Sequence, residues 1–241
     1  MTCSSERGCP LCGARHEAEV VRPDGRQVAK CDACGLWYVR SMAAGEHPAS
    51  TLASPDPDGS VRVTRLAVLA GGLKNKRLLS LGHENAEFLE GVRRQGAAVA
   101  RNSASGLFDV VVTGNLLGVA EEPLAVFESA LQSLRPRGLL LTLSQNGGAG
   151  SKCWAGFRCD LDQVQYFSSR TIGLLAQRYD CRIEHLETLG FAIQREEIGG
   201  SGMTREFLRG MRAGRSLLTS RPPRDPRAGD HWLLAILRIG G

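Results

Sequence analysis

The 241-residue chain has no run of about 18 consecutive apolar residues, so its sequence offers no candidate for a transmembrane helix. The opening stretch, MTCSSERGCPLCG, lacks the apolar segment of a secretory signal peptide. These two absences predict a cytoplasmic protein with no membrane partner. The formal net charge of +5, from 30 basic and 25 acidic residues, is too slight to predict a nucleic-acid partner.

The sequence also lacks a Ser-His-Asp group or a pair of carboxylates with a recognisable spacing, so no catalytic residue is assigned. It is not short of cysteine, because eight cysteines are present. Four of them form two Cys-x-x-Cys pairs near the N-terminus, which are Cys9 with Cys12 and Cys31 with Cys34. In a cytosolic chain this pattern favours a metal site over a disulfide framework.

The two cysteine pairs predict a zinc ribbon. Each pair can turn two thiolates toward one point, and four thiolates suit a tetrahedral Zn²⁺ in a closed, structural site. Gly13 and Gly35 directly follow the pairs, where such a turn favours a positive φ. Residues 17–30 predict a strand, a turn and a strand, and residues 36–39 predict a third short strand. A redox-active dithiol is the alternative.

We predict three parts along the chain: a zinc ribbon over residues 1–40, a linker over 41–60 and a larger domain over 61–241. The linker is rich in Ala, Ser, Pro and Asp and has little periodicity. In the larger domain, short apolar strands alternate with helices, which predicts an α/β fold with a helix-covered parallel sheet. Strands are expected at 77–81, 97–100, 108–112, 139–143 and 232–237.

Four segments carry a resemblance to a known family. They are CPLCG with CDACGLWYVR, then LLSLGHENAEFL, then FDVVVTGNLLG with LRPRGLLLTLSQN, and finally WAGFRCDLDQVQYFSSRTIGLLAQRYDCRI. Together they resemble class I S-adenosylmethionine-dependent methyltransferases that carry an N-terminal zinc ribbon. The resemblance implies a Rossmann-like sheet of seven strands with one antiparallel hairpin. It also implies S-adenosylmethionine as cofactor and a sugar or small metabolite as substrate.

This chain departs from the family at the cofactor-binding turn. Glycines normally follow the first strand of the larger domain, but only Gly82 remains there, and Glu84 and Ala86 stand at the later glycine positions. No carboxylate ends the second strand, where Asn102 is the polar candidate. Residues 102–107 are too few for another helix and strand, so we predict a sheet that lacks one strand-helix unit.

Several residues are candidates for binding. If a cofactor binds, the resemblance assigns it to Gly82, His83, Glu84 and Asn102. His83 and Glu84 either form a repurposed site or lie in a solvent-exposed turn, and the exposed turn is favoured. Asn115 and Tyr166 are candidate substrate contacts, although Tyr166 could instead pack in the core.

Three functions follow as hypotheses. The first is a degenerate methyltransferase-like protein that does not bind S-adenosylmethionine and acts as a binding or scaffold partner, for a small molecule or a protein, in a biosynthetic pathway. The second is an active methyltransferase on a sugar or small metabolite. The third is a zinc-ribbon adaptor for RNA or protein. Whether the chain is an enzyme stays open at this point.

Overall fold

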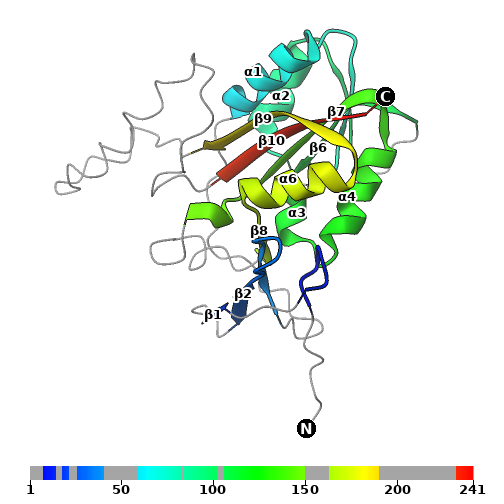
Figure 1. Cartoon of the computed structure of the whole chain (residues 1–241). Helices are drawn as coiled ribbons and strands as arrows, with labels where there is room; N and C mark the ends of the chain where they lie inside the picture. The colour runs from blue at the N-terminus through cyan, green and yellow to red at the C-terminus, as the bar shows by residue number, and fades with distance from the viewer. Residues whose placement is uncertain are drawn as a thin grey trace, which may run out of the picture.

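The computed structural model describes residues 8–14, 18–21, 26–40, 59–82, 84–101, 106–149, 163–189 and 232–240 (Figure 1). The N-terminal part contains β1 (Ala18–Val21), β2 (Gln27–Lys30) and β3 (Trp37–Val39). The first half of the larger part contains α1 (Gly59–Ala70), β4 (Arg77–Ser80), α2 (Ala86–Arg94), β5 (Ala98–Arg101), β6 (Phe108–Gly114), α3 (Leu116–Val119) and α4 (Pro123–Gln132). The rest contains β7 (Leu134–Gln145), the short 3-10 helix η1 (Gly147–Ala149), β8 (Gln165–Tyr166), α6 (Ser169–Arg178), β9 (Cys181–Leu189) and β10 (Trp232–Ile239).

The larger part is built on a mixed sheet with the strand order β5-β4-β6-β7-β10-β9. The first four of these strands run parallel, and β10 is antiparallel to both of its neighbours. The predicted α/β architecture and the reduced sheet are therefore confirmed. Strands β5 and β6, although consecutive in the chain, are not neighbours in the sheet but lie on either side of β4.

Helices cover both faces of the sheet, so its central strands are buried on both sides (Figure 1). Leu78 and Leu79, which are adjacent in β4, point into two different apolar cores. The core with Leu78 contains Leu66 of α1 and Phe88 of α2, whereas the core with Leu79 contains side chains of α4 and α6. This two-sided burial explains why the central strands are continuous apolar runs rather than alternating ones.

Strand β7 begins earlier than the sequence predicts. The sequence predicts that residues 135–138 end the preceding helix and that the strand covers 139–143. In the structure β7 starts at Leu134, which pairs with Phe108, and the chain passes through Arg137 with a φ of 63° before regular pairing resumes at Leu139. The irregular residues lie at the start of the strand, where a missing amide donor costs little.

The N-terminal strands join the larger part through β8. Strand β3 pairs antiparallel with β8, which gives a second sheet in the order β1-β2-β3-β8. Trp37 lies opposite Tyr166, and the Val39 amide donates to the Val164 carbonyl at 2.9 Å. Seven buried residues of the ribbon, among them Leu11, Leu36 and Tyr38, belong to the same apolar core as α6.

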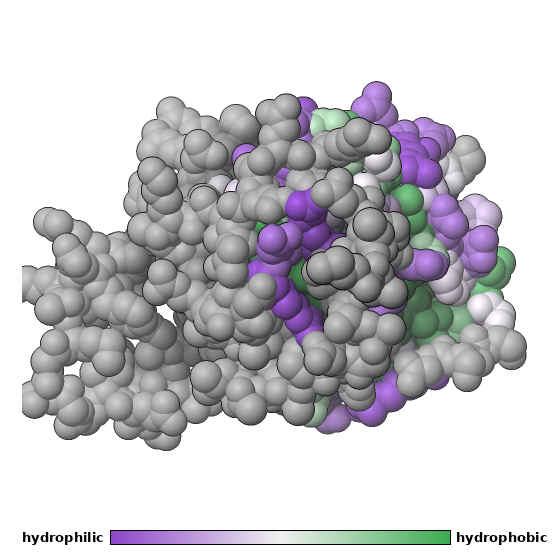
Figure 2. Space-filling view, turned by 90° about the horizontal axis from the view of Figure 1, so that it is seen from below, coloured by the Kyte–Doolittle hydropathy of each residue, from purple (hydrophilic) through white to green (hydrophobic). Residues whose placement is uncertain are grey.

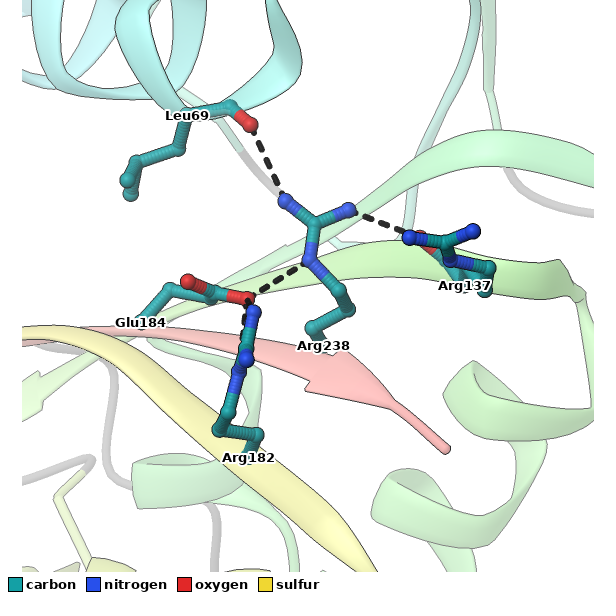
Figure 3. A network of polar contacts seen from close by, with 5 residues as sticks. All are labelled: Leu69, Arg137, Arg182, Glu184 and Arg238. Atoms are coloured by element: carbon teal, nitrogen blue, oxygen red, sulfur yellow. Dashed lines mark hydrogen bonds and ion pairs between the residues drawn. The ribbon is translucent and has the colours of Figure 1, made fainter. Parts of the chain in front are cut away.

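Arg238, near the end of β10, connects three elements (Figure 3). Its Nε donates to Glu184 Oε1 at 2.6 Å, its Nη1 to the Arg137 carbonyl at 2.9 Å, and its Nη2 to the Leu69 carbonyl at 3.0 Å. The last of these bonds satisfies a carbonyl in the final turn of α1 that has no partner within the helix, and it places a positive charge at the negative end of the helix dipole.

We expect Arg238→Lys to lower the free energy of unfolding by about 1.5–3 kcal/mol, because one ammonium cannot reach three acceptors in three directions. Urea denaturation measures the change. Arg182→Lys is the matched control, since Arg182 also contacts Glu184 but its side chain is 74 % exposed. Equal stability losses in the two variants would contradict the connecting role of Arg238.

Candidate functional site

Four cysteines come together in the N-terminal ribbon. The Sγ atoms of Cys9, Cys12, Cys31 and Cys34 all lie within 4.8 Å of one another. Both cysteine pairs sit in turns closed by the same hydrogen bond, in which the amide of the following glycine donates to the first cysteine carbonyl. Gly13 donates to Cys9 at 2.8 Å and Gly35 donates to Cys31 at 2.7 Å.

The two turns use their glycines as the sequence predicts. Gly13 has a φ of 71° and Gly35 a φ of 77°, a region that residues with a Cβ adopt only at a cost. Four converging sulfurs with no carboxylate or imidazole among them form a donor set typical of a structural metal centre. The described residues therefore contain a cluster that could hold a metal ion.

The thiols influence one another strongly in this cluster. The hydrogen bond with Cys34 at 3.4 Å lowers the pKa of Cys9 to about 5. Burial raises the pKa of Cys12 to about 11, and the contact with Cys9 raises the pKa of Cys34. Four thiolates crowded into this space repel one another without a cation, so full deprotonation is coupled to metal binding.

Figure 2 views the molecule from the ribbon end. Described hydrophilic residues there lie beside hydrophobic ones.

The turn after β4 is the second candidate site. Gly82 has a φ of 83°, a conformation that would let a ligand approach the backbone closely. The side chain nearest to Gly82, however, is Leu116 of the protein itself. A side-chain carbon placed on Gly82 would lie 3.4 Å from Leu116 Cβ and 3.6 Å from both Leu116 Cδ atoms. The first residue of α3 thus lies beside Gly82, which stays partly exposed. His83 lies outside the described residues.

Glu84 forms a buried ion pair with Arg62 of α1. Arg62 Nη1 lies 2.8 Å from Glu84 Oε2, and both side chains are 0 % exposed. The Arg62 guanidinium also stacks 4.7 Å from the centroid of the Phe88 ring. The predicted solvent-exposed turn is therefore wrong for Glu84, because a complementary charge on another helix makes its burial possible.

The N-terminus of α2 is capped by its own Asn85 and packs against α1 at Phe88. Asn85 Oδ1 accepts the Glu87 amide at 2.7 Å, so the side chain satisfies one of the free amides in the first turn. A Cβ placed on Gly59, the first residue of α1, would lie 2.8 Å from the Phe88 nitrogen. The helix end that receives an anion in nucleotide-binding folds is here capped and in contact with α1.

The two candidate substrate contacts lie in one buried polar network. Asn115 Nδ2 donates to Gln163 Oε1 at 2.7 Å, Gln163 Nε2 donates to the Gln165 carbonyl, and Gln165 Nε2 donates to the Ala120 carbonyl at 2.6 Å. Tyr166 is 0 % exposed, and its hydroxyl donates to the Gln163 carbonyl at 3.3 Å. Tyr166 therefore lies in the core.

The structure brings Gly82 and Asn115 close together, through Leu116, whereas Tyr166 belongs to the ribbon interface. Asn102 lies outside the described residues. Arg62 and Gln163 were not among the residues predicted from the sequence. Nothing in the sequence indicates that a single arginine in α1 is buried, and Gln163 belongs to no recognisable motif. Neither residue could therefore be predicted as part of a site.

Gly118 is the position where this network tolerates no side chain. A Cβ there would lie 2.5 Å from Asn115 Oδ1 and would overlap Gln163 Nε2. We expect Gly118→Ala to displace both amides and to cost at least about 1–3 kcal/mol of stability, the usual penalty for overpacking. Thermal or urea unfolding measures it. Gly173→Ala in α6 is the control, because nothing lies within 4 Å of a Cβ there.

No protein-family model and no curated protein matches the chain. Similar solved structures include an S-adenosylmethionine-dependent methyltransferase from Mesorhizobium loti, with 14 % identity over 73 % of this chain and 96 % of that one, at a TM-score of 0.45. A putative methyltransferase from Bacillus halodurans has 12 % identity over 74 % and 99 % of the two chains, at a TM-score of 0.49. An S-adenosylmethionine-dependent methyltransferase from Archaeoglobus fulgidus has 16 % identity over 75 % of this chain and 94 % of that one, at a TM-score of 0.45.

At these identities and TM-scores the similarities carry no argument about activity, cofactor or substrate. The strand order, the parallel β5-β4-β6-β7 half and the antiparallel β10 define a methyltransferase-like α/β fold. Next to it lies a cluster of four cysteines that could bind a metal ion. No helix among the described residues is both long and apolar enough to span a bilayer.

Proposed function

We propose that this chain is a methyltransferase-like protein that does not bind S-adenosylmethionine at the β4 turn. It serves instead as a binding or scaffold partner in a biosynthetic pathway. The buried Arg62–Glu84 pair is the observation that carries the proposal. Ligands of open α/β sheets bind at the carboxyl ends of the strands and at the following helix N-terminus, and here Arg62 and Leu116 lie against the turn that follows β4.

The energetics of the pair support this proposal. Opening the turn for a cofactor would separate Arg62 from Glu84, and leaving a buried charge without its partner costs about 3–5 kcal/mol. A cofactor with an intrinsic Kd of about 1 μM would then bind with a Kd of roughly 0.2–5 mM. Leu116 would have to leave Gly82 as well. The sum of these costs argues against an ordinary methyltransferase.

Calorimetric titration tests the cofactor part of the proposal. We expect no saturable binding of S-adenosylmethionine or S-adenosylhomocysteine below millimolar concentration, with an active methyltransferase titrated in parallel as control. A Kd in the micromolar range would refute the proposal and favour the active enzyme.

We further propose that the four cysteines hold one structural Zn²⁺. The donor set fits this ion, since four thiolates give a closed tetrahedral site with no position left for substrate. Zinc would supply a cross-link between the two turns, and the cysteines would supply all of its ligands. Elemental analysis is expected to find one zinc per chain. Purified protein with reduced cysteines and no zinc would refute this part.

A further inference from the structure

Helix α6 contacts both metal-binding turns through its side chains. Arg178 Nη1 donates to the Leu11 carbonyl at 2.9 Å, and Leu11 lies between Cys9 and Cys12. At the other end of α6, Arg170 Nη2 donates to the Ala33 carbonyl at 2.9 Å, and Ala33 lies between Cys31 and Cys34. One rigid helix thus contacts one backbone carbonyl within each cysteine pair.

A third bond reaches a ligand residue itself. The Thr171 hydroxyl donates to the Cys34 carbonyl at 3.3 Å, and Thr171 is 0 % exposed. The same hydroxyl takes part in the capping box with Ser168 that begins α6. The start of the helix and the orientation of Cys34 therefore depend on one side chain.

The apolar side of α6 contributes to the same contact. Ile172, Leu175 and Ala176 are buried in the core that also contains Leu11 and Leu36 of the two turns. The separation of the turns is consequently set by packing as well as by hydrogen bonds. Rigid support of this kind holds ligand atoms near their final geometry before the metal arrives.

Charge favours the arrangement too. Four thiolates outweigh the charge of a divalent ion, so the filled site is anionic. The guanidinium groups of Arg170 and Arg178 lie next to it, and the positive end of the α6 dipole begins at Ser169. The helix thus offers compensating charge as well as geometry.

We infer that α6 pre-organises the metal centre, so that the ribbon is not a self-contained zinc module. Metal binding and the folding of the α6 side of the larger part form one cooperative unit. Arg170, Thr171 and Arg178 are positioning residues, because they act on the cysteines through the backbone. This inference rests on the zinc centre proposed above.

The test compares zinc affinity between variants of the full-length chain. We expect the double variant R170A/R178A to bind zinc about 10-fold more weakly in chelator competition, the lower end of the effect seen for residues that support metal ligands. Both arginines are exposed, so the variant should stay folded, which far-UV circular dichroism verifies. The double variant R93A/R94A, which also removes two exposed positive charges, is the charge-matched control on α2, and Gln177→Ala is the control on α6 itself.

Hydrogen exchange gives a second readout. Chelation of zinc is expected to raise amide exchange across α6 (Ser169–Arg178), while α2 (Ala86–Arg94), on the opposite face of the sheet, changes less. If zinc is bound but its affinity in R170A/R178A equals that of wild type and α6 exchange is unaffected, the inference is overturned and the zinc centre stands. If the wild-type chain holds no zinc, the zinc proposal itself fails.

Discussion

Replacing Cys31 with serine, or removing zinc with a strong chelator, is expected to unfold the ribbon together with α6 and to lower strongly the melting temperature and the unfolding enthalpy of the protein. Structural zinc contributes on the order of 10 kcal/mol of folding free energy, which is comparable to the total stability of a typical domain. Cys31 is fully buried in the core that joins the ribbon to α6, so the loss should extend beyond the ribbon. Differential scanning calorimetry measures the result.

The control for this prediction is Cys181→Ser. Cys181 is a half-buried free cysteine in β9, outside the metal-binding cluster, and its replacement is expected to shift the melting temperature only slightly. The prediction is contradicted if Cys31→Ser melts within a few degrees of wild type.

The second large effect concerns the Arg62–Glu84 pair. We expect Arg62→Met and Glu84→Leu each to lower the free energy of unfolding by about 3–5 kcal/mol, because each leaves the other charge buried without its partner. The double variant Arg62→Met/Glu84→Leu should recover much of this loss, since two apolar side chains of suitable volume can replace a buried pair at little cost.

A double-mutant cycle in urea measures the coupling between the two residues. Glu90→Gln is the matched control, because Glu90 faces Arg93 at 4.0 Å with both side chains about half exposed, and such a pair contributes less than about 1 kcal/mol. Additive single effects at the buried pair would mean that Arg62 and Glu84 do not depend on each other. The explanation for the occupied turn would then be wrong.

Much of the fold was predictable because it depends on local patterns. The apolar runs at Leu78–Leu79 and Phe108–Val112 predicted two central strands, and Gly13 and Gly35 marked the turns of both cysteine pairs. The two-residue strand β8 was missed because two residues are too few to show alternation. Without β8, the ribbon appeared to be a separate module.

The state of the β4 turn could not be predicted for a different reason. The loss of glycines was visible in the sequence, but the new partner of Glu84 lies 22 positions earlier, in another helix. Charged residues are mostly exposed, so the expectation from composition alone is a solvated glutamate. Only the spatial arrangement of α1 shows that the pair is buried.

The position of β10 has a consequence for how the chain is made. This last strand lies between β7 and β9, so β9 has no place in the sheet until residues 232–239 are available. During synthesis the edge of β7 that pairs with β10 has no partner strand until the last residues of the chain have left the ribosome. Exposed strand edges in such intermediates promote aggregation. We therefore expect chains cut before Trp232 to be captured by chaperones or to precipitate, whatever the state of the cysteine cluster.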